Sequence, residues 1–287
     1  MRILSVQSAV AHGHVGNSAA VFPLQRIGHE VLPVFTVLFS NHTGYGAWRG
    51  PVLAPADVHE VILGIEDRGL LGGIDLVLSG YLGSPGIADV VLDAVDRVKR
   101  ANPAAAYACD PVMGNARSGC YVDPALPDLL RDRVIRAADL ITPNQFELAF
   151  LTGAFDGSQA PTLDTVLEAA AAARALGPST VLVTSVEVAR QDPGEIAMLA
   201  CTGAGTWRVR TPRLAMTANG SGDVTAALFS AHLCATGDPG AALARTASSV
   251  FDLLELTHAA GSRELLLVEA QQAYAEPRLQ FGVEQLS

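Results

Sequence analysis

Short continuous runs of apolar residues alternate with helical patterns along most of this chain. The continuous runs predict strands, and apolar residues recurring three or four positions apart predict helices. Strands are expected at 2–7, 31–38, 75–79, 105–109, 140–142 and 180–184, with an antiparallel pair at 195–202 and 207–211. Helices are expected at 17–26, 58–67, 87–100, 125–136, 145–152, 162–176, 221–235, 241–257 and 263–274. The residues from about 276 onward are expected to form a loose tail.

This alternation predicts an α/β fold. Strands that are apolar throughout are typical of a parallel sheet buried on both faces, so we expect a doubly wound, mostly parallel sheet between helices. No shift in composition marks a linker and no repeat is visible, and we therefore expect a single domain over residues 1–287. The segment 41–55 carries aromatic residues, glycine and proline, and it has the length of a functional loop.

Polar residues stand where the expected strands end. In an open parallel sheet, ligands bind at the carboxyl edge of the strands, so these side chains would share one site. Each could instead serve only to form the turn after its strand, because Ser, Asp and Asn favour turns. The residues are Ser8, Ser79 with Tyr81, Asp110, Thr142 with Asn144, and Thr184. Their number favours a binding site at this edge.

A glycine-rich turn, Asn219-Gly220-Ser221-Gly222-Asp223, leads directly into the apolar helix expected at 221–235. A helix start offers unpaired N–H groups and a partial positive charge, and glycine lets a phosphate approach such a backbone closely. A carboxylate beside that anion hole suits a general base next to a phosphoryl group. The alternative is a capped helix with Asn or Ser as the N-cap and Asp in the first turn.

Common nucleotide and hydrolase motifs are absent from the sequence. It contains no P-loop, no G-x-G-x-x-G after the first strand and no G-x-S-x-G elbow. The step from Asn144 to Glu147 places an amide and a carboxylate on one face of a helix start. That carboxylate is suited to Mg²⁺, either directly or through water. The alternative is a capping box with Asn144 as the N-cap.

Composition and charge restrict the partners. The formal net charge is −10 and no run of Lys or Arg occurs, so neither nucleic acid nor an anionic membrane is expected as a partner. No secretion signal or membrane-length apolar run is visible, which favours a cytoplasmic protein. The four cysteines lack metal-binding spacing and are interpreted as free thiols. His12 and His14 have no third ligand nearby in sequence, so zinc is not expected there.

Several separated blocks resemble the pyridoxal (vitamin B6) kinases of the ribokinase-like superfamily. The resemblance runs from about residue 3 to residue 230. Its most specific block is Ser-Asn-His-Thr at 40–43, whereas Gly-x-Gly-Asp is shared by the whole superfamily. The blocks lie at 6–8 with 14–20, 39–45, 79–83, 109–114, 142–147 and 220–223.

The resemblance implies a ribokinase-like homodimer that phosphorylates the 5′-hydroxymethyl group of pyridoxal with ATP, giving pyridoxal 5′-phosphate. Asp223 would be the catalytic base, beside an anion hole formed by Gly220, Ser221 and Gly222. The implied substrate contacts are Ser8, Thr43, Gly44, Tyr81 and Asp223. ATP, Mg²⁺ and K⁺ would be served by Asp110, Asn144, Glu147, Thr184 and Ser185, with Asp110 and Glu147 as the metal residues.

Three features depart from the family pattern. Asn115-Ala116 stands where some members have an acidic residue, and Thr184-Ser185 stands where others have Lys. The region 187–206, which folds over ATP in the family, matches weakly, so adenine contacts are not predicted. The source of phosphate neutralisation therefore stays open.

For Cys120, Tyr45 and Trp48, and for the function of the whole chain, more than one interpretation stays open. The Cys120 thiol has the chemistry to add to the pyridoxal aldehyde as a hemithioacetal, but an ordinary loop cysteine is the favoured interpretation. Tyr45 and Trp48 are interpreted as a cover for the substrate, with packing of their own loop as the alternative. For the whole chain, the competing functions are a hydroxymethylpyrimidine kinase and a non-catalytic carrier of pyridoxal or its phosphate. Intact Asp223, Asn144 and Glu147 favour catalysis.

Overall fold

The computed structural model describes residues 1–155 and 160–286. Within them, nine strands form one sheet in the order β11-β10-β9-β8-β7-β4-β3-β1-β2. Every neighbouring pair from β2 to β8 is parallel, and β9, β10 and β11 extend the sheet antiparallel. The strands are β1 (Arg2–His12), β2 (Glu30–Asn41), β3 (Leu76–Ser79), β4 (Ala106–Cys109), β7 (Leu140–Ile141), β8 (Thr180–Val186), β9 (Glu195–Thr202), β10 (Gly205–Pro212) and β11 (Val283–Gln285). The predicted fold class is confirmed.

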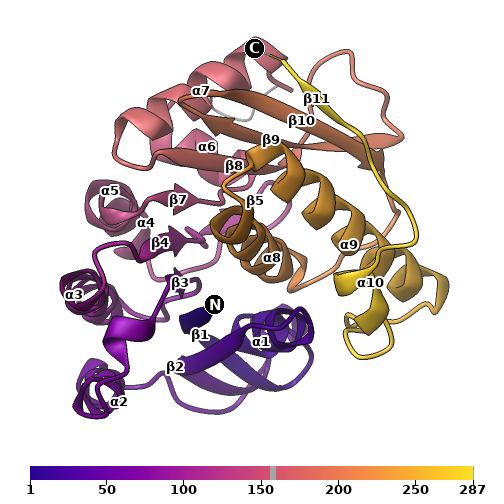
Figure 1. The fold of residues 1–287 in the computed structure, drawn as a ribbon. Helices are drawn as coiled ribbons and strands as arrows, with labels where there is room; N and C mark the ends of the chain where they lie inside the picture. The colour runs from indigo at the N-terminus through magenta and orange to yellow at the C-terminus, as the bar shows by residue number, and fades with distance from the viewer. Residues whose placement is uncertain (156–159, 287) are drawn as a thin grey trace.

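Helices cover both faces of this sheet (Figure 1). On one face lie α1 (Asn17–Arg26), α8 (Ser221–Thr236), α9 (Pro239–Ala259) and α10 (Gln271–Ala275). On the other lie α2 (Pro55–Asp67), α3 (Pro85–Ala101), α6 (Gln145–Thr152) and α7 (Leu163–Ala175), with the short α4 (Leu126–Leu129) and α5 (Ile135–Ala137). The predicted helix 125–136 is thus divided by a π-helical turn at Leu130–Val134.

Two apolar layers hold the sheet in place. Leu76 and Leu78 face the layer under α1 and α8, whereas Val77 faces the layer under α2 and α3. Because β3 is buried on both faces, it reads as a continuous apolar run rather than an alternating one. Each such side chain contributes roughly 1.5–3 kcal/mol when fully buried. The central strands are therefore a rigid support for the polar residues at their carboxyl ends.

The first strand is longer than the pattern predicted. β1 continues through Ser8 to His12, and its pairing with β2 shifts register between Gln7 and Ala9. At this bulge Ser8 lies opposite two residues of β2, Thr36 and Val37, so the extra residue is on β2, and the Ser8 side chain is buried. A bulge re-aims a side chain while the strand continues. The polar residues after Gln7 were therefore interpreted wrongly as the end of the strand.

The C-terminal prediction was wrong in two respects. Residues 263–274 do not form one helix, since only α10 is helical, and Leu265, Leu267 and Ala270 instead bury their side chains against α8 and α9. The end of the chain is not loose, because β11 pairs with β10 from Val209 to Trp207. Ser287 lies outside the described residues. Tertiary burial here overrides the local helical pattern.

A small hairpin near the carboxyl edge was not predicted. It consists of β5 (Gly114–Asn115) and β6 (Gly119–Cys120). The Asn115 side chain accepts hydrogen bonds from the backbone N–H groups of Arg117 and Ser118 and so closes the turn. Among the described residues, no helix is both long and apolar enough to cross a lipid bilayer.

Candidate active site

The glycine-rich turn is built as an anion-binding helix start. Gly220 occupies the N-cap position of α8 in the left-handed region, with a φ of 87°, and no side chain caps the helix. The Ser221 hydroxyl instead donates to the Ala218 carbonyl at 2.8 Å. The capped-helix alternative is therefore wrong at this helix. First-turn N–H groups lack partners within a helix, so they stay available to an anion.

Glycine is required where this turn meets the first loop. A Cβ on Gly220 would lie 1.8 Å from the His14 carbonyl oxygen, which no packing tolerates. At Gly222, in contrast, no atom lies within 4 Å of the Cβ position, and the residue faces a cavity. Gly220 thus allows close packing of backbone, and Gly222 leaves room for a ligand to approach the backbone.

Asp223 stands in the first turn of α8 at the wall of a cavity. Burial among protein atoms raises the pKa of its carboxyl to about 6, although hydrogen bonds from the N–H of Gly16 and from its own N–H act in the opposite direction. Removal of water disfavours the charged form, and N–H donors favour it. A carboxylate with a pKa near neutrality is suited to accept a proton.

One cavity, of about 340 Å³, opens beside Asp223. It is lined by all the predicted substrate residues except Cys120, namely Ser8, Thr43, Gly44, Tyr81 and Asp223. Prediction from sequence missed further lining residues from the 14–16 turn, the β5–β6 hairpin and β2. These are Val10, Val15, Val37, Phe39, His42, Val112, Asn115, Ser118 and Tyr121. Asn219 and Gly220 of the predicted glycine-rich turn also line this cavity. An apolar wall with a few polar groups is typical of a small-molecule site.

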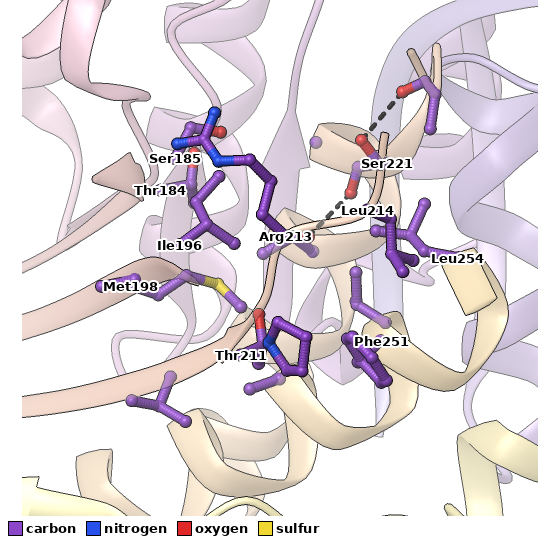
Figure 2. Close-up of a pocket in the computed structure, with 18 of the residues that line it drawn as sticks. Thr184, Ser185, Ile196, Met198, Thr211, Arg213, Leu214, Ser221, Phe251 and Leu254 are labelled. Atoms are coloured by element: carbon purple, nitrogen blue, oxygen red, sulfur yellow. Dashed lines mark hydrogen bonds between the residues drawn. The ribbon is translucent and has the colours of Figure 1, made fainter. Parts of the chain in front are cut away.

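A second cavity, of about 230 Å³, borders the glycine-rich turn at Ser221 (Figure 2). Ser221 and Gly222 line it together with the predicted residues Thr184 and Ser185. Apolar side chains from β9, α9 and the segment after β10 form the rest, with Met198, Leu214, Met216, Phe251 and Leu254 among them. None of these was predicted, because the segments that contribute them carry no nucleotide motif.

Arg213 places a cation at the rim of the second cavity. Figure 2 shows its side chain extending along the cavity with the guanidinium toward Thr184 and Ser185. The guanidinium also pairs with Glu187 at 2.7 Å and is partly exposed. Ser185 itself has a φ of 53°, an uncommon conformation for serine, at the register shift of β8 against β9. Strain of this kind is concentrated at functional sites.

Asp110, Asn144 and Glu147 line neither cavity; Asp110 directly follows β4, and Asn144 and Glu147 form the start of α6. The Asn144 side chain accepts from the Glu147 N–H at 3.0 Å while Glu147 accepts from the Asn144 N–H at 2.9 Å, so the capping-box alternative is correct as geometry. Glu147 also accepts from the N–H of Met113. The Thr142 hydroxyl donates to Asp110 at 2.9 Å.

The two buried carboxyl groups carry strongly shifted pKa values. Burial raises the pKa of Asp110 well above its usual range, and the charges of Glu147 and Asp223 raise it further. Burial also raises the pKa of Glu147, against three backbone hydrogen bonds that lower it. The charge of Asp223 acts on both groups, and such repulsion favours a nearby cation. Among the described residues, however, no three His, Cys, Asp or Glu side chains are grouped closely enough to hold a metal by themselves.

Three further residues named in the sequence analysis line neither cavity. Cys120 is exposed on β6 and does not line the larger cavity, although Tyr121 beside it does. Its reaction with an aldehyde stays a prediction. Tyr45 and Trp48 do not line the cavity either. Trp48 stacks near Phe39 with ring centroids 5.9 Å apart, which agrees with the packing alternative.

Comparison with known proteins assigns the family. Residues 72–264 match the family model described as phosphomethylpyrimidine kinase. The chain is 67% identical to pyridoxal kinase PdxY of Leifsonia xyli subsp. xyli, over 99% of both proteins. It is 60% identical to the protein of that name from Corynebacterium diphtheriae over the full length of both. The chain belongs to the pyridoxal kinase family.

Solved structures agree with this assignment. The fold of the kinase superimposes on pyridoxal kinase from Leishmania donovani in complex with ADP and pyridoxine with a TM-score of 0.92. That comparison covers 100% of this chain and 99% of the other, at 28% identity. The family is thus an ATP-using one, and the kinase phosphorylates pyridoxal.

Proposed function

We propose that the kinase transfers the γ-phosphoryl group of ATP to the 5′-hydroxymethyl oxygen of pyridoxal across the glycine-rich turn. The observation that carries this proposal is the position of the turn between the cavities. Gly220 and Asp223 line the larger one, and Ser221 and Gly222 line the smaller one. Pyridoxal occupies the larger cavity and ATP the smaller one, so the alcohol and the γ-phosphate meet at the N-terminus of α8.

In this proposal Asp223 removes the proton of the attacking alcohol. A primary alcohol is a weak nucleophile, and its oxygen gains a bond to phosphorus as the bond to the ADP oxygen breaks. The carboxylate accepts the released proton, and its raised pKa makes that acceptance favourable. The N–H of Gly16 holds the carboxylate in place. Phosphoryl transfer itself needs positioning and charge stabilisation more than covalent help.

Two groups of the protein would stabilise the negative charge of the phosphates. The N–H groups at the start of α8 form the anion hole, and the open space at Gly222 lets a phosphate oxygen come close to them. Arg213 supplies the cation that the sequence lacks at Thr184-Ser185, since its guanidinium points to those residues. Guanidinium groups bind phosphate with two parallel hydrogen bonds.

Asp110 and Glu147 fit a role with Mg²⁺. Burial raises the pKa of both groups, and the charge of Asp223 raises both further, so a nearby cation would stabilise their charged forms. Mg²⁺ at kinase sites takes one or two carboxylates and completes its shell with phosphates and water. Glu147 already accepts three backbone hydrogen bonds, which favours contact through water. When bound, Mg²⁺ would neutralise phosphate charge. K⁺ stays the expected monovalent cation.

The remaining expectations concern assembly and location. We propose that residues 1–287 act as one domain in a cytoplasmic homodimer. The edge strand β2 and its surroundings expose apolar side chains that would suit a second copy, including Phe35, Leu38, Trp48, Val52 and Val61. Sedimentation equilibrium would show about twice the 29.8 kDa chain mass for a dimer.

The pKa of Asp223 predicts the acid limb of the pH profile. Its carboxyl must be deprotonated to act as a base, and its pKa is about 6. We therefore expect kcat/KM for pyridoxal to rise about tenfold per pH unit below that value and to level off above it. Bound Mg²⁺ would move the limb to lower pH, because a cation favours the carboxylate. A profile that falls with rising pH across this range would contradict the assignment.

Arg213→Ala should weaken the binding of ATP and leave the binding of pyridoxal unchanged. Loss of a charge-assisted hydrogen bond to phosphate predicts a rise in the KM for ATP of roughly 10- to 100-fold, with the KM for pyridoxal within about twofold. Arg210→Ala is the matched control, because Arg210 on β10 is also partly exposed and lies outside this cavity. Equal effects of the two substitutions on ATP would remove Arg213 from the nucleotide site.

Substrate preference tests the proposed function against the competing one, phosphorylation of hydroxymethylpyrimidine. ADP release is measured with pyridoxal and with hydroxymethylpyrimidine at matched concentrations. The apolar cavity beside Tyr81, and the pyridoxal kinase relatives, favour pyridoxal by a large ratio in kcat/KM. A preference for the pyrimidine would move the chain to the phosphomethylpyrimidine kinase branch of the matched family.

A further inference from the structure

A carboxylate far along the chain joins the two loops that border the larger cavity. Glu264 follows α9 and lies in the segment wrongly expected to be helical. Its Oε1 accepts from the Tyr45 hydroxyl at 2.6 Å and lies 3.0 Å from His42 Nε2. Its Oε2 accepts from the His14 N–H at 3.3 Å. One side chain thus contacts the 42–45 loop and the 13–16 turn.

The contacts at the 42–45 loop are close and mutually supporting. Arg263 lies over the Tyr45 ring, 3.8 Å from its centroid, and donates to the Gly44 carbonyl at 3.3 Å. His42 is buried and packs under Gly44, where a Cβ would lie 3.0 Å from its Nδ1. Thr43 and Gly44, the cavity-lining residues, are therefore held between Glu264 and Arg263 on one side and the cavity on the other.

The 13–16 turn is fitted to the same carboxylate. Gly13 has a φ of 85°, and a Cβ there would lie 2.3 Å from Glu264 Oε2, so only glycine leaves room for the contact. The turn then provides Val15 to the cavity wall and the Gly16 N–H to Asp223. Burial would raise the pKa of Glu264, but hydrogen bonds from Tyr45 and His42 outweigh it and lower the pKa. Glu264 is thus a carboxylate at neutral pH.

We propose that Glu264 is a positioning residue for the vitamer site, which holds the Thr43–Tyr45 turn against the cavity through Tyr45 and His42. It touches neither cavity itself. Breaking its contacts frees the loop that carries Thr43 and Gly44 and leaves the nucleotide cavity intact. The expected effect is therefore weaker binding of pyridoxal without weaker binding of ATP. This inference rests on the proposed assignment of the larger cavity to pyridoxal.

The test is a double-mutant cycle on KM. Glu264→Gln and Tyr45→Phe should each raise the KM for pyridoxal about 10-fold and leave the KM for ATP within about twofold. The double variant should be no worse than the stronger single one, because both weaken the same hydrogen bond: Glu264→Gln removes the acceptor's charge and Tyr45→Phe removes the donor. Glu66→Gln is the control, since Glu66 is likewise a carboxylate held by another side chain, that of Arg97, but it lies on α2 and lines neither cavity.

Several results would overturn the inference. An unchanged KM for pyridoxal in both single variants, additive effects in the double variant, or an equal rise in both KM values would each do so. Tyr45→Phe keeps the test valid if Glu264→Gln folds poorly. Ser8→Ala separates this inference from the cavity assignment. If Ser8→Ala raises the KM for pyridoxal and Glu264→Gln does not, only the positioning role fails. If neither does, the cavity assignment fails with it.

Discussion

Asp223→Asn should lower kcat by about 10²–10⁴ with little change in fold. The amide has nearly the same shape and still accepts the Gly16 N–H, but it takes no proton from the alcohol. Burial of the charged carboxylate opposes folding at neutral pH, since it raises the pKa of Asp223 to about 6, well above the usual range of an aspartate. The neutral variant should therefore melt at the same temperature as the wild type or higher. Single-turnover kinetics and thermal melting measure the two effects.

The control is a carboxylate of ordinary structural role. Asp93 on α3 pairs with Arg97 and His59, away from both cavities. Asp93→Asn should keep kcat within about twofold, because exposed ion pairs contribute little. The acid limb of the pH profile should also vanish in Asp223→Asn and persist in Asp93→Asn. Near-wild-type turnover of Asp223→Asn would exclude this carboxylate as the base.

Gly220→Ala should cost about 10²-fold or more in kcat. The added methyl would meet the His14 carbonyl at 1.8 Å, so the turn or the first loop must move by more than 1 Å to accept it. Displacement of this size at a catalytic group typically costs about 10²-fold. Because Gly220 lies between the two cavities, both KM values should rise with the fall in kcat. Steady-state kinetics with each substrate varied in turn measure these effects.

The matched control lies at the other end of the same helix. Gly237 caps α8 with a φ of 67°, and no atom lies within 4 Å of its Cβ position. Gly237→Ala therefore carries the same left-handed backbone strain, about 1–2 kcal/mol, without the clash. Gly237→Ala should therefore lose some melting temperature and keep its activity, whereas Gly220→Ala should lose more melting temperature because of the clash. Activity measured well below both melting temperatures separates the anion hole from stability. Full activity in Gly220→Ala would contradict the proposed geometry.

Local signals in the sequence predicted much of the framework. Helix α1 (Asn17–Arg26) and helix α6 (Gln145–Thr152) begin and end where the pattern placed them. At α6 the capping box fixes the start and Gly153, in the left-handed region, fixes the end. The antiparallel pair β9 and β10 was also predicted. Such features depend on residues close together in the chain, which a single sequence displays.

The unpredicted parts depend on residues far apart in the chain. Glu264 meets Tyr45 across 219 positions, and nothing near Glu264 indicates that contact. The helical pattern at 263–274 fails because Leu265 and Leu267 find burial in the core in an irregular conformation. Arg213 enters the second cavity from the end of β10, where no motif marks a phosphate site. The residues in the family blocks lie mostly around the larger cavity. The apolar residues that line the smaller cavity lie outside those blocks.

The most direct test of the central claim is the stoichiometry of ADP and pyridoxal 5′-phosphate formed from ATP, pyridoxal and Mg²⁺. ADP is measured with a coupled assay, and the product is followed by its absorbance in the same reaction. Transfer across the glycine-rich turn predicts one ADP for each pyridoxal 5′-phosphate, and a rate lost in Asp223→Asn. Tight binding of pyridoxal or its phosphate with no ADP released would contradict the account and favour a carrier. ADP release without the phosphorylated vitamer would contradict transfer to the bound alcohol.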